Sequence, residues 1–375
     1  MDNLKNNYNY KIRQIAMDLK VIVDVPQGVL IGQDKINDKN NLPIIYIITR
    51  AVEKIAENNE LRHYHSMENH IIPMLLRIKD VEENVGHRKL LFWAILFHDA
   101  IYDFKATNGK NERDSAELWR YLSYKTFDKN GNGPFKFENV NLIFEMILAT
   151  YGHESQKPSV RKFLKMDLNG FTQPFNLTLE DELKIRKEYN FVNWSTYQKG
   201  RIDFLNKFIN NSIIQEMGVA NILKMQAEYM MFIKPKIAVF PGTFEFWHVG
   251  HHEVLQKLEA IFDKVIIVFA INTDKKISSR KVPKILETRQ VEFVEGSLMK
   301  YIESLTYPVT IARGLRNGTD LLAEQAYFHW LGILGKKDIK TIAVFADPLN
   351  EYISSSALKS IKAIDEEQFK AHVYE

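Results

Sequence analysis

The chain has 375 residues, 45% of them hydrophobic and 26% charged, which is typical of ordered globular domains and excludes wholesale disorder. Its 50 basic and 47 acidic side chains leave a net charge of +3, which argues against an electrostatic nucleic-acid binder. Cysteine is absent, so disulfides, thiolate metal sites and cysteine nucleophiles are excluded. The polar first residues and short apolar runs predict neither an export signal nor a membrane span, and we expect a cytoplasmic protein.

Two different patterns meet near the segment 232–236, and a chain of this length predicts two or three domains. Residues 44–232 carry apolar side chains at three- and four-residue spacing, which predicts an all-α helical bundle. Residues 236–375 alternate short Val- and Ile-rich runs with helical patterns, which predicts an α/β Rossmann-like domain with a parallel sheet. Residues 1–43 show no clear pattern. The expected helices are 44–57, 88–97, 115–124, 140–150, 179–189, 200–209, 251–261 and 321–334, and the expected strands are 237–240, 264–270, 309–312 and 341–345.

The helical half contains imidazoles and carboxylates near the ends of predicted helices. His98 and Asp99 follow the apolar helix that contains residues 90–97. The other candidates are His65, His70, His153 and Asp167. Imidazole nitrogens and carboxylate oxygens suit a divalent ion, and helices that each project one such group inward could form a metal site. A His-Asp dipeptide is common, so by itself it indicates little.

The segments 96–103, 111–116, 149–153 and 163–168 together resemble the HD-domain family of metal-dependent phosphohydrolases, over about residues 43–224. The resemblance implies a divalent metal such as Mn²⁺, Mg²⁺, Fe²⁺ or Zn²⁺. Its expected ligands are His70, His98, Asp99 and Asp167. The family usually has its two early histidines four positions apart, whereas His65 and His70 are five apart, so either could be the ligand. We favour His70 and expect His65 beside the ligands or at the substrate phosphate.

Such a ligand set implies hydrolysis of a phosphate ester or anhydride, in a nucleotide or a small phosphorylated metabolite. Glu112 and His153 could transfer protons or orient the leaving group, and we expect His153 next to the metal ligands. Arg113 could neutralise phosphate charge. Glu112 and Arg113 could equally be the solvated start of a helix, because such residues are mostly exposed.

The second half begins with a predicted strand, a glycine turn and a helix, and His248-Val-Gly-His251 lies where the helix starts. The three-residue spacing places both imidazoles on one side of the first helical turn. Unpaired N–H groups at the helix start attract anions, and Gly250 lets a ligand approach the backbone closely. The arrangement suits phosphoryl transfer, although a motif this short is only moderately specific.

Three further segments of this half follow predicted strands or begin a helix. Residues 272–276 carry two lysines, 313–320 carry two arginines, and 353–358 carry three serines. Arginines can grip phosphates with two hydrogen bonds, and serines can either cap a helix or contact phosphates. Because ligands of open α/β sheets bind at the carboxyl ends of strands, we expect these segments to meet at one site.

These segments resemble the His-x-Gly-His nucleotidyltransferase family, most closely its phosphopantetheine adenylyltransferase branch, over about residues 236–361. The resemblance implies adenylyl transfer from ATP, with Mg²⁺, to a phosphate monoester and release of pyrophosphate, a step of coenzyme A biosynthesis. The residues expected at the reacting phosphates are Thr243, His248, His251, Lys275, Lys276 and Arg316. Those expected to line the substrate or ATP site are Phe244, Gly250, Arg313, Gly314, Glu324, Ser354, Ser355 and Ser356.

The loop Glu245-Phe-Trp-His248 is bulkier than the family usually has, so the acceptor could instead be nicotinamide mononucleotide or another phosphate monoester. The leading hypothesis is a bifunctional enzyme that acts on ATP, a phosphate-bearing acceptor and a related phosphorylated metabolite. We expect a homo-oligomer without membrane or nucleic-acid partners. The alternatives are a helical half that senses nucleotides or mediates oligomerisation without catalysis, and an α/β half that only binds a nucleotide.

Overall fold

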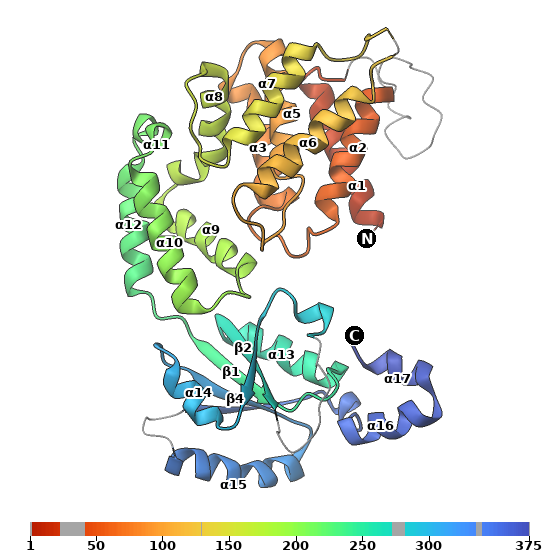
Figure 1. Ribbon diagram of the computed structural model, residues 1–375, viewed down its shortest axis with the longest axis vertical. Helices are drawn as coiled ribbons and strands as arrows, with labels where there is room; N and C mark the ends of the chain where they lie inside the picture. Colours follow the sequence, from red (N-terminus) through yellow and green to blue (C-terminus); the bar gives the residue numbers. More distant parts are fainter. Residues whose placement is uncertain (1, 23–41, 129, 272–281, 335–339, 375) are drawn as a thin grey trace. The chain divides into compact units, whose positions relative to one another are not determined.

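The computed structural model describes residues 2–22, 42–128, 130–271, 282–334 and 340–374, and it forms two compact units (Figure 1). The first contains Met1–Glu188 and Arg201–Tyr229, and the second contains Tyr189–Gly200 and Met230–Glu375. The segment 189–200 therefore packs with the second unit, although it precedes the predicted break at 232–236 in the sequence. Its Asn193 side chain donates a hydrogen bond to the Tyr307 hydroxyl at 3.0 Å.

The region before residue 233 is helical, as predicted, and it contains more helices than the apolar spacing indicated. They are α1 (Asp2–Asp18), α2 (Leu42–Ala56), η2 (Met67–Ile71), α3 (Ile72–Leu76), α4 (Ile78–Val81), α5 (Val85–His98), α6 (Lys110–Tyr124), α7 (Phe137–Ala149), α8 (Pro158–Asp167), η3 (Leu168–Thr172), α9 (Phe175–Glu188), α10 (Trp194–Ile209), α11 (Ser212–Met217) and α12 (Ala220–Phe232). Helix α5 is buried over its whole second half, so it forms the centre of the first unit's core.

Helix α1 lies in the stretch for which the sequence pattern predicted nothing. Its buried side chains Tyr8, Ile12 and Ile15 recur at four- and three-residue spacing among Asn and Lys, and the helix packs against α2. Only one narrow face of this helix is buried, so few of its residues are apolar. The apolar spacing is therefore difficult to detect in the sequence.

The described residues of the second unit form a sheet of five parallel strands in the order β3-β2-β1-β4-β5. The strands are β1 (Ile237–Gly242), β2 (Lys264–Ile271), β3 (Gln290–Glu295), β4 (Thr310–Leu315) and β5 (Lys340–Phe345). Four of them match the predicted strands within a few residues. Strand β3 was missed because it is an edge strand, mostly half-exposed, whose acidic residues interrupt the apolar run.

Helices α13 (Val249–Ile261), α14 (Leu298–Ser304) and α15 (Gly318–Leu334) pack on the sheet and complete the Rossmann-like arrangement that the alternating pattern predicted. Helices α16 (Ser355–Ile364) and α17 (Glu366–His372) pack against each other and against Phe246 and Val249, beside the loop that follows β1. Successive residues of β4 point to opposite faces: Ala312 joins the core beneath α13, whereas Ile311 packs against Met299 of α14. Because β1 lies between β2 and β4, the strand order reverses direction there, which is where open α/β sheets form a binding crevice.

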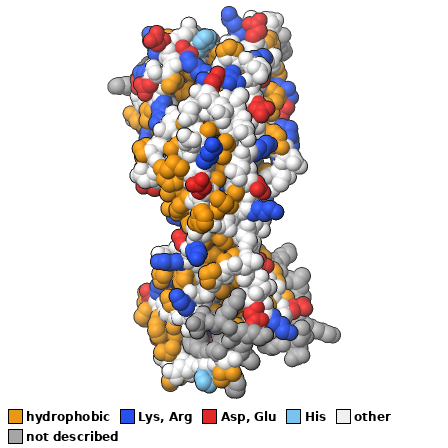
Figure 2. All heavy atoms as spheres, turned by 90° about the vertical axis from the view of Figure 1, so that its left-hand side faces the viewer, with side chains coloured by type: hydrophobic (Ala, Val, Ile, Leu, Met, Phe, Trp, Pro, Cys, Tyr) orange, Lys and Arg blue, Asp and Glu red, His pale blue; other side chains and the backbone are white. Residues whose placement is uncertain are grey.

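Within the described ranges, every helix is too short or too polar to cross a bilayer. Figure 2 shows Lys and Arg side chains interspersed with Asp and Glu over the face it draws, without a continuous basic stripe. This distribution agrees with the near-neutral net charge.

Candidate functional site

A cavity of about 330 Å³ opens at the carboxyl ends of β1 and β4. The predicted residues that line it are Thr243, Phe244, His248, Gly250, His251, Arg313, Gly314, Arg316, Glu324, Ser354 and Ser355. They come from three separate stretches of the chain, as expected for ligand contacts at a topological switch point. The fold thus brings the histidine loop, the arginine segment and two of the serines to one site.

The remaining predicted residues of this half lie elsewhere. Ser356 is exposed in α16 and does not line the cavity, because Ser354, the N-cap of that helix, turns the chain away. The Ser354 hydroxyl accepts a hydrogen bond from the backbone N–H of Ala357 at 3.1 Å. Lys275 and Lys276 lie outside the described residues.

The loop between β1 and α13 is held by aromatic packing. Phe244 has a φ of +38°, a conformation rare for residues other than glycine, and its ring lies over Gly242, where an added Cβ would come within 2.6 Å of it. The same ring meets His251 edge to face, with centroids 4.9 Å apart. A glycine at position 242 is therefore required for Phe244 to support the histidine.

The bulky residues of this loop do not fill the cavity. Trp247 is buried in the core beneath α13, and Phe246 packs against Phe369 of α17 at a centroid distance of 5.1 Å. Neither residue lines the cavity. Phe246 and Trp247 make this loop bulkier than the family usually has. Because both side chains pack into the surrounding cores, they leave the space beside His251 open.

The two histidines of the loop are stacked and neutral. His248 is the N-cap residue of α13, and its ring lies 3.6 Å, centroid to centroid, from that of His251. Burial and the nearby Arg316 lower the pKa of His248 to about 4. Burial, with His248 as neighbour, lowers the pKa of His251 well below its usual value. Neutral imidazoles at a helix start can donate hydrogen bonds to phosphate oxygens.

Both cavity arginines already hold carboxylates. The Arg313 guanidinium donates to both carboxylate oxygens of Glu324, at 2.9 and 2.5 Å, and to the carbonyl of Pro241 at 2.8 Å. Arg316 donates to both oxygens of Asp320 at 2.9 Å. These bonds fix the two side chains at the cavity wall, so they present oriented positive charge to an anion. The spacing of the sequence did not indicate Asp320 as a partner.

The last residues of the chain brace the histidine loop from outside. The backbone N–H of Tyr374 donates to the carbonyl of Trp247 at 2.9 Å, and His248 forms an isolated antiparallel bridge with Val373. The Tyr374 ring lies 5.0 Å from that of His252. Sequence reasoning missed this contact, because no local pattern links residues more than 120 positions apart.

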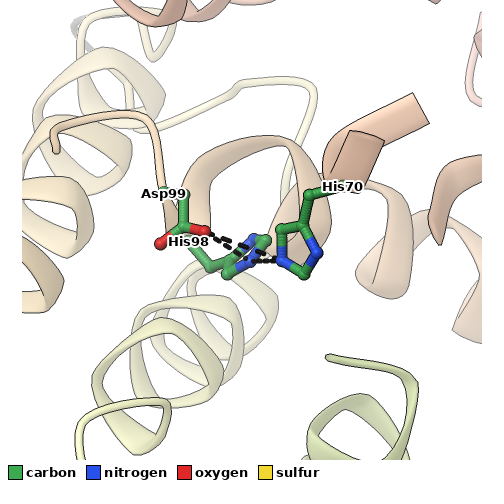
Figure 3. Close-up of side chains that lie close together, drawn as sticks. All are labelled: His70, His98 and Asp99. Atoms are coloured by element: carbon green, nitrogen blue, oxygen red, sulfur yellow. Dashed lines mark hydrogen bonds and ion pairs between the residues drawn. The ribbon is translucent and has the colours of Figure 1, made fainter. Parts of the chain in front are cut away.

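In the first unit, three of the predicted metal ligands, His70, His98 and Asp99, lie close together (Figure 3). The Nε2 atoms of His70 and His98 are 2.9 Å apart. Oδ2 of Asp99 lies 3.2 Å from Nε2 of His98 and 3.6 Å from Nε2 of His70. Oδ1 of Asp167 lies 3.0 Å from the His70 nitrogen and 3.4 Å from the His98 nitrogen. Helices η2, α5 and α8 thus bring two nitrogens and two oxygens together.

The spacing of these atoms fits a divalent ion. Ligand atoms that lie about 2.1 Å from a metal in tetrahedral or octahedral geometry are roughly 3.0–3.4 Å from one another. Nδ1 of His98 lies 2.8 Å from the carbonyl of Ile95, which accepts its hydrogen bond and so directs Nε2 at the cluster. His70, His98 and Asp99 thus offer three ligand atoms within 4.8 Å of one another that could hold a metal, with Asp167 beside the two imidazoles.

The cluster is buried and electrostatically coupled. Burial alone would lower the pKa of His98, but Asp99 and Asp167 outweigh it and raise that pKa well above its usual value. Burial would likewise raise the pKa of Asp167, but His98, His153 and His70 hold it well below its usual range. Nε2 of His153 lies 2.9 Å from Oδ2 of Asp167. His153 is thus in contact with Asp167, one of the predicted ligands.

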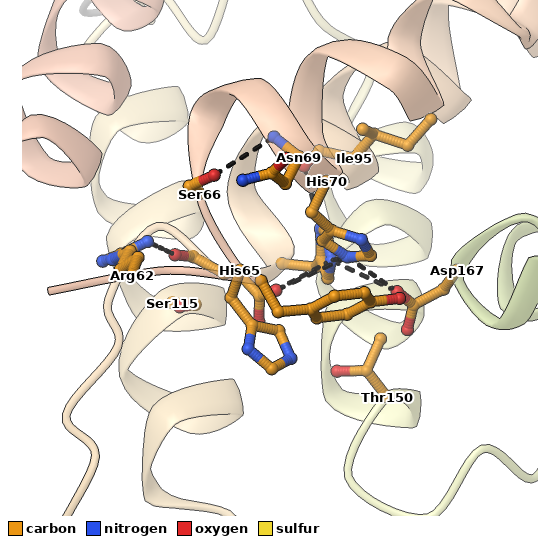
Figure 4. A network of polar contacts seen from close by, with 12 residues as sticks. Arg62, His65, Ser66, Asn69, His70, Ile95, Ser115, Thr150 and Asp167 are labelled. Carbon is orange, nitrogen blue, oxygen red and sulfur yellow. Dashed lines mark hydrogen bonds and ion pairs between the residues drawn. The ribbon is translucent and has the colours of Figure 1, made fainter. Parts of the chain in front are cut away.

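His65, Glu112 and Arg113 were the remaining predictions in this unit, and Arg113 is exposed. Nδ1 of His65 lies 2.7 Å from Oε2 of Glu188, and Figure 4 shows its ring apart from the contacts that join His70 to Asp167. The geometry therefore favours His70 over His65 as the early ligand. Glu112 lies half-exposed in the first turn of α6.

Comparisons with known proteins concern the second unit. Residues 239–360 match the family model described as cytidylyltransferase-like. The phosphopantetheine adenylyltransferase of Lactobacillus acidophilus is 32% identical over 144 residues, which cover 35% of this chain and 86% of that relative. Those of Leuconostoc mesenteroides (32% over 134 residues; 33% and 81% covered) and Cytophaga hutchinsonii (31% over 139 residues; 35% and 91% covered) are also similar.

Proposed function

We propose an adenylyltransferase function for residues 239–360, through which this chain belongs to the cytidylyltransferase-like family of nucleotidyltransferases. This part of the chain transfers the adenylyl group of ATP to a phosphopantetheine-like phosphate monoester. The proposal rests on one observation. Two neutral histidines at a helix start and two arginines held by carboxylates line the same cavity. Relatives that match most of their own length over this region are phosphopantetheine adenylyltransferases.

In the proposed reaction, a phosphate oxygen of the acceptor forms a bond to the α-phosphorus of ATP. The bond from that phosphorus to the oxygen of the β-phosphate breaks, and pyrophosphate leaves with the electron pair. His251 and the first N–H groups of α13 donate hydrogen bonds to the phosphate oxygens, and Arg316 contributes positive charge. Mg²⁺ that accompanies ATP neutralises its phosphates further. The rate arises from positioning and charge, because no covalent intermediate is needed.

The acceptor proposal has support from the loop that made nicotinamide mononucleotide an alternative. Phe246 and Trp247 point into the neighbouring cores, so the bulk of the loop does not narrow the cavity. The deciding experiment incubates the protein with ATP and either phosphopantetheine or nicotinamide mononucleotide, and identifies the product by mass spectrometry. We expect a product with phosphopantetheine, and loss of that product in His251→Ala. Pyrophosphate release without an acceptor requirement would contradict the proposal.

For the helical unit we propose metal-dependent hydrolysis of a phosphate ester or anhydride. The convergence of His70, His98, Asp99 and Asp167 supports it, because their donor set and spacing suit a divalent cation. A cation bound there withdraws charge from a phosphate and lowers the pKa of water. Within this unit, His153 holds the Asp167 carboxylate in place through their 2.9 Å contact.

The test of hydrolysis measures phosphate release from a panel of nucleotides and phosphorylated metabolites with Mn²⁺ or Mg²⁺. We expect activity in the wild type and none in His98→Ala, with the adenylyl transfer of the other unit retained in both. Bound metal without phosphate release from any substrate would favour the alternative, a helical unit that senses nucleotides or mediates oligomerisation. We also propose that the protein forms a homo-oligomer.

A further inference from the structure

Glu188 is a buried carboxylate whose contacts all serve one short segment of the first unit. It ends α9, and its side chain has 0% exposure. Oε1 accepts hydrogen bonds from the backbone N–H groups of Tyr64 (2.6 Å) and His65 (2.8 Å). Oε2 lies 2.7 Å from Nδ1 of His65. Burying an ionised carboxylate costs free energy unless it is well paired, so three contacts to two adjacent residues indicate a specific purpose.

These contacts fix the ring of His65. A carboxylate accepts hydrogen bonds and donates none, so Nδ1 of His65 carries the proton in this pair. The ring is also stacked on Tyr102, with centroids 4.5 Å and planes 25° apart, and it lies edge to face against His70 at 5.7 Å. The side chain keeps 22% exposure. With Nδ1 held by Glu188, Nε2 is the ring atom that can meet a ligand beside the metal cluster.

We propose that Glu188 is a positioning residue that holds His65 so that its Nε2 contacts the phosphate group of the substrate bound at the metal cluster. The inference rests on the hydrolase function proposed above and adds the residues that orient its substrate. Because Glu188 occupies Nδ1, the ring orientation leaves Nε2 as the nitrogen that can hydrogen-bond a phosphate oxygen. Buried carboxylates hold histidines in one orientation in the same way in other catalytic sites.

Phosphate affinity of the manganese-loaded protein tests the inference, with inorganic phosphate as the probe and calorimetry as the measurement. Loss of a charge-assisted hydrogen bond predicts affinity lower by roughly 10- to 100-fold in His65→Ala. Glu188→Gln should weaken binding to a smaller extent, because the amide still accepts from the two backbone N–H groups. Manganese content should stay at the wild-type level in both variants, since neither residue belongs to the four proposed ligands.

A double-mutant cycle separates positioning from a merely structural role. If Glu188 acts through His65, then Glu188→Gln should cause no further loss of phosphate affinity in the His65→Ala background. The matched control is Glu182→Gln, on the same helix and equally buried, whose carboxylate pairs with Arg201 and Gln226. This control should bind phosphate as the wild type does. Glu188→Asp, which keeps the charge, serves if the Gln variant does not fold.

A metal-independent readout checks the proton placement. The ¹⁵N resonances of His65 should show a protonated Nδ1 in the wild type and an altered pattern in Glu188→Gln. Unchanged phosphate affinity in His65→Ala, or equal losses from Glu188→Gln with and without His65, would overturn the inference while leaving a His98-dependent hydrolase intact. A wild-type protein that releases no phosphate from any substrate and does not bind it would instead refute the hydrolase proposal, and this inference with it.

Discussion

The imidazole rings of His248 and His251 stack with their centroids 3.6 Å apart and their planes 25° apart. Two charged rings at this distance would repel each other, and burial and Arg316 already hold the pKa of His248 at about 4. Both rings are therefore neutral at physiological pH. They are suited to donate hydrogen bonds, and among the described residues that line the cavity the positive charge belongs to Arg313 and Arg316.

This neutral pair predicts a pH dependence of stability. The unfolded chain binds a proton at His248 near pH 6.5, but the folded chain binds it only near pH 4, so the unfolded state holds more protons between these values. The contribution of the neutral His248 ring to the free energy of unfolding is therefore fully present above pH 6.5 and is lost as the pH falls to about 4. It amounts to roughly 3 kcal/mol at 1.36 kcal/mol per pKa unit. Urea unfolding at pH 7.5 and 4.5 should show a smaller loss in His248→Asn than in the wild type; equal losses would count against the buried neutral ring.

Gly242→Ala should damage the histidine loop. The added methyl group would lie 2.6 Å from the Phe244 ring, which cannot move without disturbing its contact with His251. Overpacking of this kind costs roughly 1–3 kcal/mol, and we expect adenylyl transfer to fall by more than stability alone explains. Gly318→Ala is the control, because nothing lies within 4 Å of its added Cβ and the residue begins a helix. Chemical denaturation and product formation measure both; a fully active Gly242→Ala variant would disprove the requirement.

Removal of the carboxylate that holds Arg313 should weaken ATP binding. Glu324→Gln replaces two charge-assisted hydrogen bonds, and we expect a loss of roughly 1.5 kcal/mol in stability and about a tenfold rise in KM for ATP. The exposed pair Lys370–Glu366 offers a comparison, since both side chains are more than half exposed and such pairs contribute little. Glu366→Gln should therefore change neither quantity. Equal effects of the two substitutions would show that Arg313 needs no fixed partner.

A divalent metal should stabilise the first unit. A ligand at 100 times its Kd adds about 2.7 kcal/mol to the free energy of unfolding, so Mn²⁺ should raise the melting temperature and a chelator should reverse the rise. His98→Ala should lose this response together with the bound metal, as measured by elemental analysis. His87→Ala is the control, because that side chain is 61% exposed on the same helix. A melting temperature that rises equally with Mn²⁺ in His98→Ala would place the metal elsewhere.

Local patterns were sufficient for part of this architecture. The apolar runs of β1, β2, β4 and β5 predicted the parallel sheet. In β1 and β2 the run is almost continuous because both faces of these strands are buried, whereas β5 was predicted from its Val- and Ile-rich run although it is an exposed edge strand. The edge strand β3 and the narrowly buried helix α1 were not predicted, because polar residues on their exposed faces interrupt the apolar pattern. The pair His98-Asp99 indicated a candidate metal site only together with the other histidines and Asp167 and with the family resemblance of the segments that carry them.

The amino-acid sequence by itself determined which residue types were available and the short-range geometry of His248 and His251 on one helical turn. Only the tertiary structure decided which distant groups meet. It joined Glu188 to His65 across 123 positions, brought Asp167 to His70, and placed Tyr374 against Trp247. The physical reason is that helical and strand periodicities are set by neighbours along the chain, whereas contacts between charged groups depend on how whole elements pack.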